Sequence, residues 1–212
     1  MIMVEKPIAI LYEHPAWSEP LFAELERWGI PYERLFLRDH WYDPAIRESP
    51  YSLVVNRVSA YPSGGTHPEV VLYVKQYLAY LESIGAEVVN GYDSYLVGTS
   101  KSVQLDIFEC LGLRYPQARV IHDQSHALAA SEGLAYPLIA KPNIGGSGAG
   151  ILKFDTRDEL SQAVEAGAMD MGIDGTLLVQ EFLPAKGRCI VRVDVLDGEY
   201  LYASRLPIAD DS

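Results

Sequence analysis

Four glycines fall within six positions, from Gly145 to Gly150, and they constrain the fold of this chain more than any other feature. The residues on either side, 137–141 and 151–154, have the length and apolar character of buried strands. Glycines without a Cβ let backbone N–H groups approach an anion closely. We therefore predict a strand–loop–strand flap that can close over phosphate groups. The alternative is a flexible surface hairpin without a ligand.

Two common nucleotide motifs do not fit this loop. The dinucleotide fingerprint requires a helix directly after the glycines, whereas residues 151–154 have the pattern of a strand. The Walker phosphate loop requires a Gly-Lys-Ser/Thr sequence, which is missing here. A Rossmann protein that binds NAD is kept only as an alternative that the structure can test, since it would require a helix directly after Gly150.

Lys141 ends the apolar segment before the glycines, and Lys101 lies on a mostly polar helix face. A lysine that leaves a buried strand loses hydration and needs an anionic partner. At about 4 Å from a phosphate oxygen, with an effective dielectric constant near 20, the attraction is about 4 kcal/mol. Lys141 is thus a candidate phosphate ligand. The alternative is a lysine whose ammonium extends to solvent at a sheet edge.

A third element is the apolar segment 176–182, which ends in Gln180 and Glu181 and is followed by Phe182 and Leu183. We interpret it as a hinge between two lobes, where unpaired backbone N–H and C=O groups match the hydrogen-bonding edge of adenine. The alternative is a core strand that ends at a turn.

The first half of the chain alternates between strand and helix patterns. Strands are predicted at residues 8–12, 32–37, 53–58 and 86–89, and helices at 18–28 and 70–85. This order predicts an open parallel sheet with covered faces, in a domain of residues 1–92. Ligands of such sheets bind beyond the carboxyl ends of the strands. His14, Asn56 and Arg57 follow strand ends, so they are candidate substrate residues, and Arg57 can pair with a carboxylate.

The second half, residues 93–212, is predicted to form another domain. A helical pattern covers residues 96–111, with Val103, Ile107, Phe108 and Leu111 on its inner side. Segments 190–196 and 200–205 are predicted to form a hairpin, because Asp197-Gly198 is a typical type I′ turn pair.

The charge balance excludes some classes of protein. The chain has 17 Lys and Arg against 29 Asp and Glu, a net charge of −12, which argues against a general nucleic-acid binder. No apolar run approaches the roughly 20 residues that span a bilayer. Charged residues interrupt the N-terminal apolar stretch early, so a signal peptide is not expected. We expect a cytoplasmic protein without membrane or nucleic-acid partners.

Taken together, the lysines, the flap and the hinge resemble the ATP-grasp superfamily, and in particular its RimK-like carboxylate–amine ligases. The resemblance extends from about Asn90 to Pro207 and rests on the order and spacing of several short motifs. These are Asn90, Lys101, Gly112-Leu113, Tyr136-Pro137, Ile139 to Pro142, Gly145 to Gly150, Leu178 to Leu183, and Arg192.

The resemblance implies roles for individual residues. Lys101 and Lys141 would hold ATP phosphates, and Gly146, Ser147 and Gly148 would close over them. Gln180, Glu181, Phe182 and Leu183 would lie at the adenine. Arg192 and Arg205 match basic, catalytic positions near the phosphates and the acyl substrate. The implied fold is an α/β domain with an open parallel sheet, followed by an ATP-grasp domain. The latter comprises an α+β lid at about 131–183 and an incomplete C-terminal lobe at 184–212.

The implied reaction uses ATP and Mg²⁺ to activate a small-molecule or peptide carboxylate as an acyl-phosphate. An amine such as an amino acid, glutamate in the RimK-like type, then attacks it to form an amide bond. Association into a homo-oligomer is compatible with the resemblance.

Two positions depart from the family pattern. Ile190 stands where an acidic ribose ligand is usual, and the family's metal ligands belong to strands beyond Ser212. We therefore expect a chain truncated before its metal ligands, with none of its own, and we do not assign Asp210 or Asp211 to a metal. The alternative function is a non-catalytic or truncated ATP-binding module.

Overall fold

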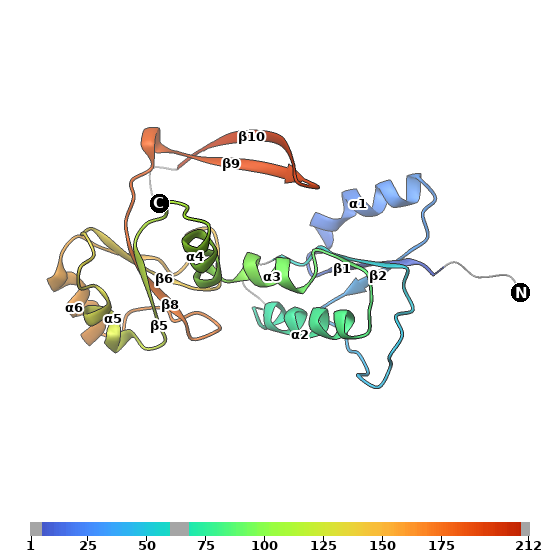
Figure 1. The fold of residues 1–212 in the computed structure, drawn as a ribbon, viewed down its shortest axis with the longest axis horizontal. Helices are drawn as coiled ribbons and strands as arrows, with labels where there is room; N and C mark the ends of the chain where they lie inside the picture. Colours follow the sequence, from blue (N-terminus) through green and yellow to red (C-terminus); the bar gives the residue numbers. More distant parts are fainter. Residues whose placement is uncertain (1–5, 60–67, 209–212) are drawn as a thin grey trace, which may run out of the picture.

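The predicted N-terminal parallel sheet is present in the computed structural model, which describes residues 6–59 and 68–208 (Figure 1). Its strands are β1 (Ile8–Tyr12), β2 (Tyr32–Phe36), β3 (Leu53–Asn56) and β4 (Val88–Val89). They are all parallel and follow the order β2-β1-β3-β4. The helices α1 (Pro15–Arg27) and α2 (Glu69–Ser83) lie on opposite faces of this sheet (Figure 1). Asp210 and Asp211 lie outside the described residues.

The apolar stripe of α2 packs on the sheet as its spacing predicts. Val74, Leu78 and Leu81 are buried against β-strand residues such as Val54. Residues three and four apart share one helix face, so this stripe covers the sheet continuously. Gly85 follows the helix with a φ of +72°, a left-handed conformation that glycine adopts without strain.

A second sheet, named the lid sheet, is antiparallel. Its strands are β5 (Ala118–Ile121), β6 (Leu138–Pro142), β7 (Leu152–Phe154) and β8 (Leu177–Glu181), in the order β5-β8-β6-β7. The helical elements η1 (Gln124–His126), α5 (Ala127–Ala130) and α6 (Arg157–Glu165) belong to the same part of the chain. Leu138, Leu160 and Leu177 are fully buried in its core. Because strand β7 follows the glycines, the Rossmann interpretation is excluded.

The single helix predicted over residues 96–111 is wrong. The structure has two helices, α3 (Tyr92–Thr99) and α4 (Lys101–Cys110), separated by Ser100. Ser100 has an extended backbone, and its hydroxyl accepts a hydrogen bond from the N–H of Val103, as an N-cap residue does. The predicted inner side is also wrong, since no residue of α4 is buried and Leu111 is 66% exposed.

The predicted hairpin is confirmed as β9 (Cys189–Leu196) and β10 (Glu199–Pro207), preceded by the short helix η2 (Lys186–Arg188). Asp197 and Gly198 both have a positive φ, +50° and +78°, as a type I′ turn requires. The hairpin extends past α4 toward the N-terminal sheet (Figure 1).

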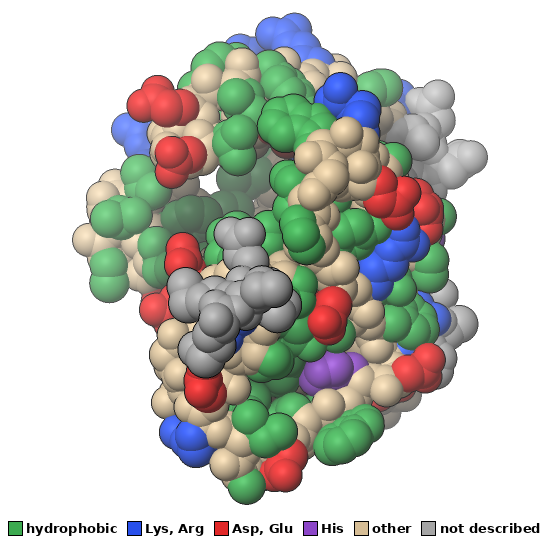
Figure 2. Space-filling view, turned by 90° about the vertical axis from the view of Figure 1, so that its right-hand side faces the viewer, with side chains coloured by type: hydrophobic (Ala, Val, Ile, Leu, Met, Phe, Trp, Pro, Cys, Tyr) green, Lys and Arg blue, Asp and Glu red, His purple; other side chains and the backbone are tan. Residues whose placement is uncertain are grey.

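The charged side chains show no segregation on the face presented in Figure 2, where acidic and basic groups are interspersed among apolar ones. Among the described residues, no helix has both the length and the apolar character needed to cross a membrane.

Candidate functional site

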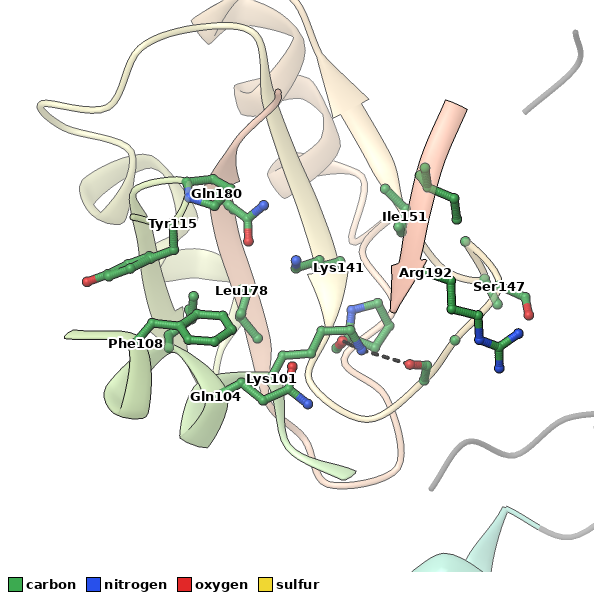
Figure 3. Close-up of a pocket in the computed structure, with 18 of the residues that line it drawn as sticks. Lys101, Gln104, Phe108, Tyr115, Lys141, Ser147, Ile151, Leu178, Gln180 and Arg192 are labelled. Atoms are coloured by element: carbon green, nitrogen blue, oxygen red, sulfur yellow. Dashed lines mark hydrogen bonds between the residues drawn. The ribbon is translucent and has the colours of Figure 1, made fainter. Parts of the chain in front are cut away.

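A cavity of about 750 Å³ lies between α4, the glycine loop, the lid sheet and the hairpin (Figure 3). This volume is in the range of sites that hold a nucleotide-sized ligand. Seven of the residues to which the sequence assigned a nucleotide-binding or catalytic role line it: Lys101, Lys141, Gly146, Ser147, Gly148, Gln180 and Arg192. They come from α4, β6, the loop after β6, β8 and β9, so the fold brings distant segments to one place.

Lys141 lies on β6, where burial alternates along the strand. Leu138, Ala140 and Pro142 are buried, so Lys141 projects from the opposite face, and it points into the cavity (Figure 3). Burial lowers the pKa of its ammonium. Its Nζ makes no hydrogen bond or ion pair with any residue in the described parts of the chain. A partly desolvated cation in this position is stabilised by an anionic ligand.

Lys101 is the first residue of α4, and its ammonium is fully engaged. Nζ donates hydrogen bonds to the carbonyl oxygens of Pro142 (3.0 Å), Asn143 (3.0 Å) and Gly145 (2.9 Å). An ammonium has three donors, so all of them hold the start of the glycine loop. Burial, and then the ammonium of Lys141, lower the pKa of Lys101 to about 8, while the carboxylate of Asp174 opposes that shift. Lys101 therefore contributes charge to the cavity and fixes its loop.

The glycine loop presents backbone donors to the cavity. The N–H groups of Gly146, Ser147 and Gly148 make no hydrogen bond with any described residue. Ser147 and Gly148 both have a positive φ, a left-handed conformation that also occurs in the backbone turns that bind anions. Gly150 also has no room for a side chain, because a Cβ there would lie 2.7 Å from Asp170 Oδ2 and 2.9 Å from Pro142 Cγ.

Asn143 is a buried residue that the sequence reasoning missed. Its Nδ2 donates to Asp174 Oδ2 (2.7 Å) and to Ser100 Oγ (3.2 Å), and its Oδ1 accepts from the N–H of Ser102 (2.9 Å). Its neighbour Ile144 packs into the core of the N-terminal domain. The base of the glycine loop is thus tied to α4, to the segment before β8 and to the first domain. Within this network, only Ser100 could have been identified from the sequence, because serine is a preferred N-cap residue at the start of a helix.

Only one of the four predicted hinge residues lines the cavity. Gln180 lines the cavity, whereas Glu181, Phe182 and Leu183 are not among its lining residues. The carboxylate of Glu181 accepts a hydrogen bond from the N–H of Ala135, and the N–H of Phe182 donates to the carbonyl of Pro137 (both 2.9 Å). Leu183 is exposed, and its N–H has no hydrogen-bond partner among the described residues.

Aromatic side chains form one end of the cavity, and cationic side chains lie at its middle and its other end (Figure 3). Phe108 and Tyr115, whose ring centroids are 6.3 Å apart, lie on the far side of Lys101 and Lys141 from Arg192 and Ser147 (Figure 3). Sequence reasoning did not assign these aromatic rings to the site. A flat base at the aromatic end and a polyanion at the cationic end would match this polarity.

The two hairpin arginines face opposite ways. Ser204 is the cross-strand partner of Arg192, and Val191 that of Arg205. Since neighbouring residues of a strand point to opposite faces, Arg205 points away from the side of Arg192. Only Arg192 lines the cavity.

A second cavity, of about 290 Å³, lies at the carboxyl ends of β3 and β4 and is lined by Trp17, Asn56, Arg57 and Gly98, among others. Asn56 is buried, and its amide bonds the carbonyl of Asn90 (3.1 Å) and the N–H of Val58 (3.0 Å). Arg57 is exposed and free of ion pairs with the described residues. His14 does not line the cavity, but its ring stacks on Trp17 with centroids 4.3 Å apart.

Across residues 6–59 and 68–208, no three His, Cys, Asp or Glu side chains come together in a way that could hold a metal ion.

Comparisons with known proteins agree with this geometry. Residues 100–206 match the family model described as "D-ala D-ala ligase C-terminus". The chain is 32% identical over 91 residues to a D-alanine–D-alanine ligase of Anaplasma centrale, a match that covers 42% of each chain.

Two solved structures share the fold. A RimK-domain ATP-grasp protein from Sphaerobacter thermophilus DSM 20745 has a TM-score of 0.66 at 22% identity, covering 88% of this chain and 68% of that one. D-alanyl-alanine synthetase A from Vibrio cholerae O1 biovar eltor str. N16961 has a TM-score of 0.65 at 16% identity, covering 95% and 66%.

Proposed function

This chain belongs to the D-Ala–D-Ala ligase C-terminal family of ATP-grasp domains, and on that premise we propose that it is an ATP-dependent carboxylate–amine ligase. The observation that carries the proposal is the ammonium of Lys141. It points into a nucleotide-sized cavity beside the unpaired N–H groups of Gly146, Ser147 and Gly148, and no described residue neutralises it.

The proposed reaction has two steps. An oxygen of the acceptor carboxylate attacks the γ-phosphorus of ATP, the bond from that phosphorus to the β–γ bridging oxygen breaks, and ADP leaves. The amine nitrogen then attacks the acyl carbon of the acyl-phosphate, the bond from that carbon to the phosphate oxygen breaks, and the nitrogen loses a proton. Such chemistry requires alignment and charge stabilisation rather than a side-chain nucleophile.

The residues of the large cavity suit these demands. We assign the transferred phosphoryl group to Lys141, the three loop N–H groups and Arg192, which all supply positive charge or hydrogen-bond donors. Lys101 acts by its charge and by holding the loop. The base is assigned to the end formed by Phe108 and Tyr115, with Gln180 at its edge. Since Arg205 faces away from Arg192, we propose Arg192 alone as the arginine at the phosphates.

We further propose a RimK-like specificity, in which the amine is an amino acid of the glutamate type and the acceptor carboxylate is a small molecule or a peptide. The N-terminal cavity with Asn56 and Arg57 is the proposed acceptor site.

The test is ADP release by the purified chain, measured with ATP and Mg²⁺ against paired panels of carboxylic acids and amines. The proposal predicts ADP and phosphate release that requires both an acid and an amine, and its loss in the Lys141→Met variant. Tight nucleotide binding without ADP release for any pair would instead support the alternative of a non-catalytic ATP-binding module.

A further inference from the structure

The cavity of about 290 Å³ at the carboxyl ends of β3 and β4 is small and lies close to the nucleotide cavity. Its volume is at the lower limit for ligand sites and suits a compound with one ring or a short side chain. Gly98 lines this cavity and Lys101 lines the other. Three residues of chain span at most about 11 Å, so the linings of the two cavities approach each other to within that distance.

Arg57 is the cation of this cavity. It immediately follows β3, its side chain is exposed, and no described residue pairs with it. Two neighbouring polar side chains are already engaged: both amide atoms of Asn56 are hydrogen-bonded, and the carboxylate of Glu13 accepts from the N–H of Ser59 (3.1 and 3.2 Å). A free guanidinium fork is matched by a carboxylate, which it can bind through two parallel hydrogen bonds.

Trp17 supplies a flat apolar surface beside that cation. One ring face stacks on His14 at an interplanar angle of 12°, yet the side chain remains 55% exposed and lines the cavity. The Nδ1 atom of His14 is buried without a hydrogen-bond partner, so the imidazole acts here as a support for the indole. An indole that is held in place on one face and is still largely exposed favours a planar ring as its partner.

We propose that this cavity selects the acceptor of the ligase, and that the acceptor is a carboxylic acid carried on an aromatic or heteroaromatic ring. Arg57 holds the carboxylate, and Trp17, supported by His14, stacks on the ring. This inference rests on the proposed function, since it names the acceptor class of that reaction.

The test compares two acids of equal charge and similar size, benzoate and cyclohexanecarboxylate, of which only benzoate is planar. Their binding to the chain saturated with AMPPNP is measured by calorimetry or ligand-observed NMR. We expect the chain to prefer benzoate by about 2- to 10-fold, the range of an aromatic pair contact. Trp17→Ala should abolish this preference and Trp17→Phe should restore most of it. Arg57→Gln should weaken both acids equally.

Trp28→Ala is the matched control, because Trp28 follows the same helix and is 68% exposed outside the cavity. It should leave both affinities unchanged. Equal affinity for the two acids, no binding of either acid, or a preference that survives Trp17→Ala would overturn the inference. AMPPNP binding is measured separately: its loss would contradict the proposed function, whereas normal AMPPNP binding without acid selectivity would contradict only this inference.

Discussion

The ammonium of Lys101 donates a 2.9 Å hydrogen bond to the carbonyl oxygen of Gly145, a residue 44 positions further along the chain. With the bonds to Pro142 and Asn143, it makes the start of α4 and the start of the glycine loop one structural unit. The position of the loop over the cavity is therefore coupled to the charge of one lysine.

That coupling predicts a pH dependence of nucleotide binding. Burial and the ammonium of Lys141 lower the pKa of Lys101 to about 8, so the free protein loses this proton above that pH. Bound phosphate favours the protonated form, so binding takes up a proton and affinity falls as pH rises, by up to about tenfold per pH unit. Calorimetry with AMPPNP between pH 7 and 10 measures this fall.

Lys101 also affects the stability of the fold, and here the effect of rising pH is opposite to its effect on AMPPNP affinity. The unfolded chain keeps the Lys101 proton up to its ordinary pKa of 10.5, so between about pH 8 and 10.5 it binds more protons than the folded chain. This group therefore makes unfolding less favourable as pH rises through that window. In Lys101→Met, the decline in AMPPNP affinity that begins near pH 8 should be lost, because the group that titrates there has been removed. An unchanged pH profile in that variant would contradict the assignment.

If the Asn143–Asp174 hydrogen bond stabilises the fold, a second substitution should restore the stability that Asn143→Asp removes. Asn143→Asp replaces the amide donor by a carboxylate 2.7 Å from Asp174 Oδ2, so we expect a loss of about 1–3 kcal/mol in the free energy of unfolding. Adding Asp174→Asn restores a donor–acceptor pair with reversed roles and should recover most of that loss. Urea unfolding of the two single variants and the double variant gives the coupling energy. Additive effects would show that the contact is unimportant.

Two glycines of the loop should respond differently to alanine. Both Gly148 and Gly150 have a positive φ, which costs an alanine about 1–2 kcal/mol. At Gly148 a Cβ meets nothing within 4 Å, whereas at Gly150 it meets Asp170 and Pro142 below 3.0 Å. Thermal unfolding should therefore show a larger loss for Gly150→Ala than for Gly148→Ala. Equal losses would mean that the close packing at Gly150 is easily relieved.

Local patterns predicted much of the fold. Helix α1 lies between β1 and β2 and helix α2 between β3 and β4, an order of strands and amphipathic helices that is typical of a parallel sheet, and Asp197-Gly198 is typical of the hairpin turn. Strand β5 was not predicted, because two of its four residues are exposed and it has no apolar run. It is stabilised as a strand by pairing with β8, which is distant in the sequence. The break at Ser100 was missed because helical periodicity continues across it.

The candidate site was only partly predictable for a related reason. Lys141 and the glycines are visible because a charge and flexible residues follow an apolar strand. The partners of Lys101 are carbonyl oxygens, which every residue has, so no side-chain pattern reveals them. The contacts of Asn143 and the aromatic end at Phe108 and Tyr115 depend on how α4 packs against the loop and the lid.

The most direct test of the central claim is the affinity of AMPPNP for the chain and for Lys141→Met, compared with Lys75→Met, which changes a lysine on α2 outside the cavity. If Lys141 binds the polyphosphate, its loss should weaken AMPPNP binding about 10- to 100-fold, as expected for a hydrogen bond between charged groups. Lys75→Met should bind AMPPNP like the unmodified chain. Equal affinity in Lys141→Met and the unmodified chain would contradict the account.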